Sequence, residues 1–347
     1  MTLEELFRIE LPIVQAPMAG VQGSALAAAV SGAGGLGSLP CAMLGPDGIR
    51  KEVAAVRAAT TRPFNVNFFT HVEPQADEAA DPAWRGLLAP YYRELAIRTA
   101  QPPAGAARFP FNAAAAEVLE ELRPPVVSFH FGLPPPELLQ RVRGWGARII
   151  GCATTVAEAL WLQERGVDAI VAQGWEAGGH RGNFLSADLS EQLGTFALVP
   201  QVVRAVRVPV IAAGGIADAN AVAAARALGA AGVQVGTAYL LCPEATTSAV
   251  HRAALKDKHM AHTAVTNIFT GRPARGIVNR FMRELGPLNE RAPAFPGAAG
   301  PLAPLRAAAE KQGSGDFSPL WSGQNATGCR EIPAARLTRE LAGAPAD

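Results

Sequence analysis

The chain has 347 residues, of which 49% are hydrophobic, and its formal net charge is +1. This length suits one large domain, or one domain with an appendage. The near-zero charge and scattered lysines and arginines indicate no nucleic-acid-binding surface. Because the N-terminus lacks a secretory pattern and no stretch is long and apolar enough to span a membrane, we expect a cytoplasmic protein with no membrane contact.

The four cysteines are Cys41, Cys152, Cys242 and Cys329, and they stand far apart without a CxxC pair. This spacing favours neither a disulfide framework nor a metal site, so we interpret them as small buried residues. No cluster of Asp and Glu accompanies the predicted strand ends. The sequence therefore predicts no metal centre.

Short apolar runs recur along the first two-thirds of the chain, each followed by a turn and a helical pattern. These runs cover residues 12–18, 35–39, 64–69, 125–130, 147–152, 168–173, 208–213 and 232–236. Apolar strands that alternate with helices predict a parallel sheet, and eight such units predict a closed (β/α)8 or TIM barrel. An open doubly wound sheet is the alternative, but the first turn lacks G-x-G-x-x-G.

Two regions exceed a minimal barrel. The connection over residues 70–112 is a long excursion of the kind that forms a lid or cap. Beyond residue 240 the pattern changes to a helical one. We predict a barrel over residues 1–240, including the excursion, and a smaller, mostly helical C-terminal lobe over 241–347. We expect the loop 321–324 of this lobe to return to the active site.

A glycine-rich turn over residues 172–182 follows the sixth predicted strand and carries Glu176, His180 and Arg181. Barrel enzymes place their catalytic groups at such strand ends. A histidine with an ordinary pKa of about 6.5 suits proton abstraction at neutral pH, so we predict that His180 is catalytic. Glu176 is interpreted as structural. For Arg181 two interpretations stay open: it holds an anion, or it pairs with a surface carboxylate.

Two further glycine turns, at residues 214–215 and 236–237, each precede a helical pattern. Exposed backbone N–H groups at helix starts bind phosphate, although ordinary tight turns also favour glycine. Their joint occurrence after the seventh and eighth predicted strands favours the phosphate interpretation. Together with the amides Asn67, Gln173 and Gln234, these turns suit a planar cofactor that carries a phosphate.

Eight sequence blocks resemble the nitronate monooxygenases, formerly called 2-nitropropane dioxygenases. The blocks are PIVQAPMAG at 12–20, GGLG at 34–37, FNVN at 64–67, SFHFGLP at 128–134, AQGWEAGGHRG at 172–182, PVIAAGGI at 209–216, GVQVGT at 232–237 and WSGQ at 321–324. They occur in the order of that family and span nearly the whole chain.

The resemblance implies an FMN-dependent barrel enzyme that oxidises alkyl nitronates with O2 to carbonyl compounds and nitrite. His180 matches the family's active-site histidine, which acts as the base on neutral nitroalkanes. The implied FMN contacts are Asn67, Gln173, Gly178, Gly215, Gln234, Val235, Gly236 and Thr237. The resemblance implies no metal, and we also predict a possible homodimer.

The expected substrate pocket contains Met18 together with two departures from the family pattern, His130 and Trp175. A small or hydroxyl-bearing residue is expected at the first position and a serine at the second, so substrate range is open. Alternatives are an NAD(P)H-dependent FMN reductase of the same fold, acting on enoyl-acyl-carrier-protein or quinone, and a non-catalytic flavin-binding barrel. A guanine- or inosine-nucleotide dehydrogenase is disfavoured because a catalytic cysteine loop is missing.

Overall fold

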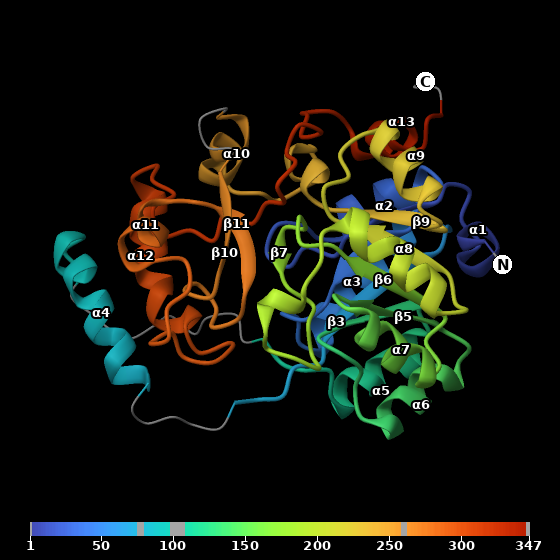
Figure 1. Cartoon of the computed structure of the whole chain (residues 1–347), viewed down its shortest axis with the longest axis horizontal. Helices are drawn as coiled ribbons and strands as arrows, with labels where there is room; N and C mark the ends of the chain where they lie inside the picture. The colour runs from blue at the N-terminus through green and yellow to red at the C-terminus, as the bar shows by residue number, and fades with distance from the viewer. Residues whose placement is uncertain (1, 75–79, 98–107, 258–261, 345–347) are drawn as a thin grey trace.

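The computed structural model describes residues 2–74, 80–97, 108–257 and 262–344. Eight parallel strands form one sheet in the order β1-β9-β8-β6-β5-β4-β3-β2, and a bridge between Val14 and Leu36 brings its two edges together. The TIM barrel predicted from the apolar runs is confirmed (Figure 1). The strands are β1 (Ile13–Gln15), β2 (Gly37–Pro40), β3 (Phe64–Phe69), β4 (Val126–His130), β5 (Arg148–Ala153), β6 (Ala169–Gln173), β8 (Val210–Ala213) and β9 (Gly232–Val235).

Successive side chains of each strand point alternately into the barrel and towards the outer helices, so the apolar residues form two cores. In β6, Ala169 and Val171 point into the barrel, whereas Ile170 and Ala172 pack against the outer helices. A strand buried on both faces must be apolar throughout, and this explains the continuous runs in the sequence. The helix α1 (Leu3–Phe7) packs its apolar side chains against the inner core.

Helices cover the outside of the barrel and begin at capping residues that the sequence supplies. Thr155 and Asp218 accept hydrogen bonds from the amides of Glu158 and Ala221, and so cap two of these helices. The outer helices are α2 (Ser24–Gly32), α3 (Pro46–Ala59), α5 (Ala113–Leu122), α6 (Pro136–Gly144), α7 (Val156–Glu164), α8 (Thr195–Ala205) and α9 (Ala219–Ala227), and short 3₁₀ helices are η1 (Leu189–Glu191) and η2 (Thr237–Leu241).

A smaller lobe lies beside the barrel, on the left in Figure 1. Its antiparallel sheet has the order β10-β11-β7, and its core contains residues from three helices. The elements are β7 (Gly179–His180), β10 (Thr263–Thr266), β11 (Ala274–Ile277), α4 (Ala80–Glu94), α10 (Ala249–Lys256), α11 (Arg280–Leu285) and α12 (Ala299–Lys311).

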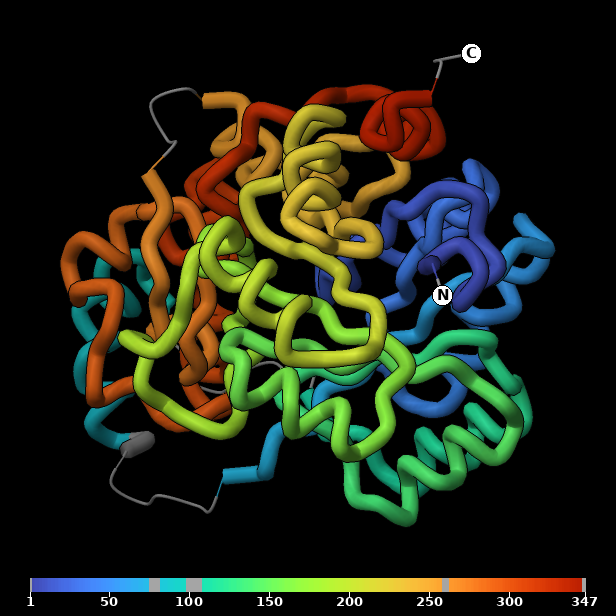
Figure 2. The backbone as a smooth tube through the Cα atoms, turned by 45° about the vertical axis from the view of Figure 1, so that its right-hand side comes forward, coloured from blue at the N-terminus to red at the C-terminus, as the bar shows by residue number. Residues whose placement is uncertain are grey.

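The lobe therefore uses segments from both sides of residue 240. Trp84 and Leu88 of α4, which belong to the predicted excursion, share a core with Phe281 and Leu305. Parts of that excursion, residues 75–79 and 98–107, lie outside the described residues. Conversely, α13 (Ala334–Leu341) follows residue 240 in the sequence but belongs to the barrel. It packs on α2 and α9, as Figure 2 shows at its upper edge. None of the described helices is long and apolar enough to cross a membrane.

We expect Trp84→Ala to destabilise the lobe, because Trp84 is fully buried and its indole Nε1 donates a hydrogen bond to the carbonyl oxygen of Ala298. Loss of a buried Trp side chain costs about 3–5 kcal/mol. Urea unfolding followed by circular dichroism measures this loss. Phe196→Ala is the matched control, because Phe196 is 74% exposed and its removal leaves no cavity. Equal unfolding free energies in the two variants would contradict the docking of α4.

Candidate active site

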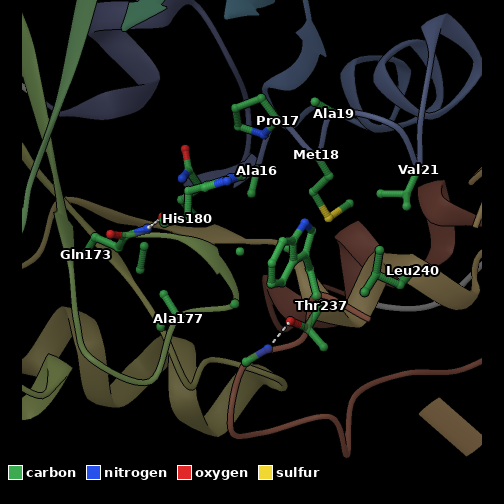
Figure 3. Close-up of a pocket in the computed structure, with 18 of the residues that line it drawn as sticks. Ala16, Pro17, Met18, Ala19, Val21, Gln173, Ala177, His180, Thr237 and Leu240 are labelled. Atoms are coloured by element: carbon green, nitrogen blue, oxygen red, sulfur yellow. Dashed lines mark hydrogen bonds between the residues drawn. The ribbon is translucent and has the colours of Figure 1, made fainter. Parts of the chain in front are cut away.

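A cavity of about 1190 Å³, including its open mouth, lies at the C-terminal ends of the barrel strands and extends to the lobe. Most of the residues that the sequence singled out line it together. They are Met18, Asn67, His130, Gln173, Gly178, His180, Gly215, Gln234, Gly236 and Thr237. Trp321 and Gly323 of the loop 321–324 line the same cavity. Figure 3 shows Gln173, Ala177 and His180 on one side and Met18, Thr237 and Leu240 on the other.

Two of the predicted site residues do not line this cavity. Val235 is 1% exposed and packs between the barrel strands and the outer helices. The Trp175 ring lies 5.4 Å from the guanidinium carbon of Arg181 and 5.3 Å from that of Arg275, so it faces two cations. Stacking with these arginines explains a tryptophan where the family pattern favours a serine.

His180 lies on β7, the short strand that pairs with β11 of the lobe. Its Nε2 lies 2.9 Å from the Thr270 hydroxyl oxygen, which also lies 3.4 Å from the carbonyl oxygen of Arg272. When the hydroxyl donates to that carbonyl, it accepts from Nε2–H, and Nδ1 keeps the free lone pair. Thr270 thereby favours the tautomer in which Nδ1 can accept a proton.

Burial lowers the pKa of His180 well below 6.5, and the electrostatic influence of the neighbouring Arg108, His130, Arg272 and His71 lowers it further. The imidazole is therefore neutral at pH 7 and free to accept a proton. A lower pKa also makes it a weaker base.

Two side chains hold the backbone of His180. The amide Nε2 of Gln173 donates to the carbonyl oxygen of His180 over 3.0 Å, and the ring Nε2 of His130 lies 3.2 Å from the same oxygen. Figure 3 draws the first of these bonds. Burial lowers the pKa of His130 to about 4, so its ring is neutral and donates through Nε2–H. Gln173 Oε1 also accepts from the amide of Gly182 over 2.8 Å. These bonds fix the turn against the strand ends.

Arg181 has neither of the two roles considered from the sequence. It is fully buried, and its guanidinium donates to the carbonyl oxygens of Gln173 and Gly174 and to the side chain of Gln192. Burial lowers its pKa to about 10, so it stays charged. Glu176 is structural as predicted, because its carboxylate accepts from the amide and hydroxyl of Thr195.

The opposite part of the cavity offers backbone N–H groups. Gly214 and Gly215 have φ angles of +114° and +73°, which favour glycine and turn the chain sharply after β8. No acceptor among the described residues bonds to the amides of Gly215, Ile216, Gly236 or Thr237. These four residues line the cavity from two adjacent strand ends. Convergent free amides of this kind bind phosphate, so the site fits a phosphate-bearing cofactor.

The loop after Trp321 closes this end of the cavity. The amide of Gly323 donates to the Thr237 hydroxyl over 3.0 Å, and the Asn325 side chain donates to the carbonyl oxygen of Gly215 over 3.0 Å. A Cβ on Gly178 would lie 2.4 Å from the amide nitrogen of Gly323, so only glycine allows this close approach. The loop thereby joins the two predicted phosphate turns to the lobe.

Several residues near the site carried no signal in the sequence. Thr270 lies between β10 and β11, and Arg108 comes from the excursion over residues 70–112. From the sequence, only a position at the end of a predicted barrel strand could mark a site residue. This criterion includes Phe69, but it does not include residues that the lobe brings to the barrel mouth. In the described part of the chain, no group of His, Cys, Asp and Glu is arranged to hold a metal.

The fold and the site define a TIM-barrel enzyme whose cavity suits a phosphate-bearing organic cofactor. A family model described as nitronate monooxygenase matches residues 1–343. A nitronate monooxygenase of Pseudomonas aeruginosa is 43% identical over 97% of this chain and 96% of its own length. The solved structure of nitroalkane oxidase from Streptomyces ansochromogenes is 42% identical, covers 98% of this chain and 96% of its own, and has a TM-score of 0.89.

The solved structure of FabK from Thermotoga maritima is more distant, with 28% identity over 98% of this chain and 94% of its own, and a TM-score of 0.70. The chain belongs to the nitronate monooxygenase family. It is therefore an oxidoreductase that acts on nitronates, and membership of this family supports a flavin cofactor.

Proposed function

We propose that the protein binds FMN and oxidises alkyl nitronates with O2 to carbonyl compounds and nitrite. The observation that carries this proposal is the cavity itself, which has a neutral histidine on one side and free backbone amides on the other. Family membership supplies the reaction class. We further propose that the enzyme acts in the cytoplasm, and we retain a homodimer as a prediction that light scattering of the purified protein can test.

The residues present fit FMN. The amides of Gly215, Ile216, Gly236 and Thr237 would bind its phosphate. The side chains of Asn67 and Gln234 would bind polar atoms of its ring, since both line the cavity. Asn67 Nδ2 already donates to the Ser128 hydroxyl over 2.9 Å, so its oxygen is the atom left for a ligand. We assign Gln173 to holding the His180 turn beside the ring. When bound, the flavin would accept electrons from the nitronate.

His180 would remove a proton from the carbon next to a nitro group and hold the nitronate that results. Nδ1 is the atom assigned to this step, because Thr270 occupies Nε2. Preformed nitronates need no proton removal. Because its pKa lies well below 6.5, His180 is neutral at pH 7 and above, so its availability as a base does not limit the reaction there.

Anaerobic mixing tests the proposed reaction. The purified protein should be yellow, and an alkyl nitronate should bleach its flavin within the mixing experiment. Admission of O2 should then restore the colour and release nitrite. Bleaching by NADH or NADPH, but not by a nitronate, would instead support the reductase alternative. A protein that stays colourless with added FMN would contradict every flavin hypothesis, and one that binds FMN without bleaching would be a binding protein.

We expect Thr270→Val to lower turnover of neutral nitroalkanes about tenfold and to change turnover of preformed nitronates less. Valine has nearly the same shape but cannot fix the His180 tautomer, and Thr270 is buried. Loss of a hydrogen bond to a buried partner costs about 1–3 kcal/mol. Steady-state rates on nitroethane and ethyl nitronate measure the two effects. Thr270→Ser, which keeps the hydroxyl, is the control. Equal loss in both variants would contradict the orienting role.

A further inference from the structure

The cavity contains a cation without a counter-charge. Arg108 lines it, and among its described lining residues there is neither Asp nor Glu. No described carboxylate pairs with the Arg108 guanidinium. Burial lowers the pKa of this arginine, and the charge of Arg306 lowers it further. A partly desolvated guanidinium that has no partner is costly, and an anionic ligand would offset that cost.

The position of Arg108 separates it from the amides assigned to the phosphate. The amide of Phe111 donates to the carbonyl oxygen of Phe69 over 2.7 Å, so the chain after Arg108 runs beside the end of β3. In the order β1-β9-β8-β6-β5-β4-β3-β2, four steps separate β3 from β8. In a barrel of eight strands, four steps lead to the opposite side of the mouth. Arg108 therefore lines the cavity near the end of β3, across the mouth from the strands that carry the free amides.

Arg108 lies instead within electrostatic reach of the histidine. After burial, its charge has the largest influence on the pKa of His180, ahead of His130, Arg272 and His71. The Arg272 guanidinium is engaged elsewhere, because it lies 4.0 Å from the centre of the Phe131 ring and donates to the carbonyl oxygen of Asn183. His130 is committed to the carbonyl of His180. Among the described residues, Arg108 is thus the cation at this end that is available to a ligand.

We propose that Arg108 binds the negatively charged oxygens of the substrate nitronate and makes the site select this anion over neutral nitroalkanes. The inference rests on the proposed nitronate oxidation. A nitronate is planar and spreads its charge over two oxygens, as a carboxylate does. The guanidinium fork matches two such oxygens in one plane, and its hydrogen bonds are charge-assisted. A neutral nitro group carries less charge on the same atoms and gains less.

Calorimetric titration with sodium nitrate tests this role without turnover. Nitrate is a planar monoanion that resembles the charged nitronate end, and ionic strength is held constant throughout. The protein is used as purified with its flavin. Arg108→Gln should weaken nitrate binding about tenfold to a hundredfold, because hydrogen bonds to charged groups are lost. Arg108→Lys keeps the charge but lacks the forked guanidinium, so its nitrate affinity should lie between those of the wild type and Arg108→Gln. Arg226→Gln, on an exposed face of α9, is the control.

Steady-state kinetics provide the second measurement. Arg108→Gln should raise KM for ethyl nitronate by a similar factor, with kcat within about threefold, and should leave KM for nitroethane within about twofold. Unchanged nitrate affinity and nitronate KM in Arg108→Gln would overturn the inference. Weaker FMN binding in that variant would also overturn it, by assigning Arg108 to the phosphate. Nitrate binding that depends on Arg108 in a protein inactive on nitronates would overturn the proposed reaction alone.

Discussion

The His180→Asn variant is expected to keep FMN and to lose most of its turnover of neutral nitroalkanes. A positioned general base contributes about 10²- to 10⁴-fold to the rate, so a loss within this range is expected on nitroethane. FMN should remain bound, because Gln173 holds the backbone carbonyl of residue 180 rather than its ring.

Preformed nitronates separate the base from other roles of this residue. Ethyl nitronate needs no proton removal, so His180→Asn should slow its oxidation by less than about tenfold. The measurements are oxygen consumption with each substrate and the flavin absorbance of the purified variant. Unchanged turnover of nitroethane would remove His180 from its assigned role. Equal losses on both substrates would instead indicate that the residue binds the nitronate rather than acting as a base.

The Gly178→Ala variant is expected to lose FMN affinity by about tenfold or more. The added methyl carbon would lie 2.4 Å from the amide nitrogen of Gly323 and 2.6 Å from the carbonyl carbon of Ser322, and both are backbone atoms. The loop must therefore move, and overpacking of this kind costs about 1–3 kcal/mol. Its movement would break the bonds that Gly323 and Asn325 make with the phosphate turns.

Fluorescence titration of the apoprotein with FMN measures this effect. Gly144→Ala is the matched control, because its added methyl group would meet no atom within 4 Å outside its own chain neighbours and helix backbone, and its site is far along the chain from the loop. The control should bind FMN as the wild type does. Wild-type affinity in Gly178→Ala would show that the loop at residues 322–325 contributes nothing to cofactor binding.

The barrel was predictable because each of its strands is buried on both faces and is therefore apolar along its length. The same logic predicted the site residues at strand ends, such as Asn67 and Gln173. The lobe was predicted only in outline. Pairing of His180 with Ala274 and docking of Trp84 on Phe281 join residues far apart in sequence, and no local pattern indicates such contacts.

Predictions for individual residues were wrong or absent for a similar reason. Arg181 was expected to hold an anion or to pair with a surface carboxylate. It is fully buried instead, and two backbone carbonyl oxygens and the side-chain oxygen of Gln192 accept its hydrogen bonds. Trp175 follows Gly174 on a turn that was expected to face substrate. Its ring points to Arg275, which the sequence places a hundred residues later. No sequence pattern pointed to Arg108, because its proposed role depends on the absence of Asp and Glu from the described lining of the cavity.

The docking of α4 in the lobe has a consequence for synthesis of the chain. Trp84 and Leu88 emerge from the ribosome long before their partners Phe281 and Phe317. At about 5–20 residues per second, the roughly 220 residues between α4 and Phe317 take about 10 to 45 seconds to translate. Until these partners have been made, the apolar face of α4 cannot complete its native packing, although the barrel strands are already available to one another. A nascent chain of this protein therefore carries α4 undocked until the C-terminal segments of the lobe have been made.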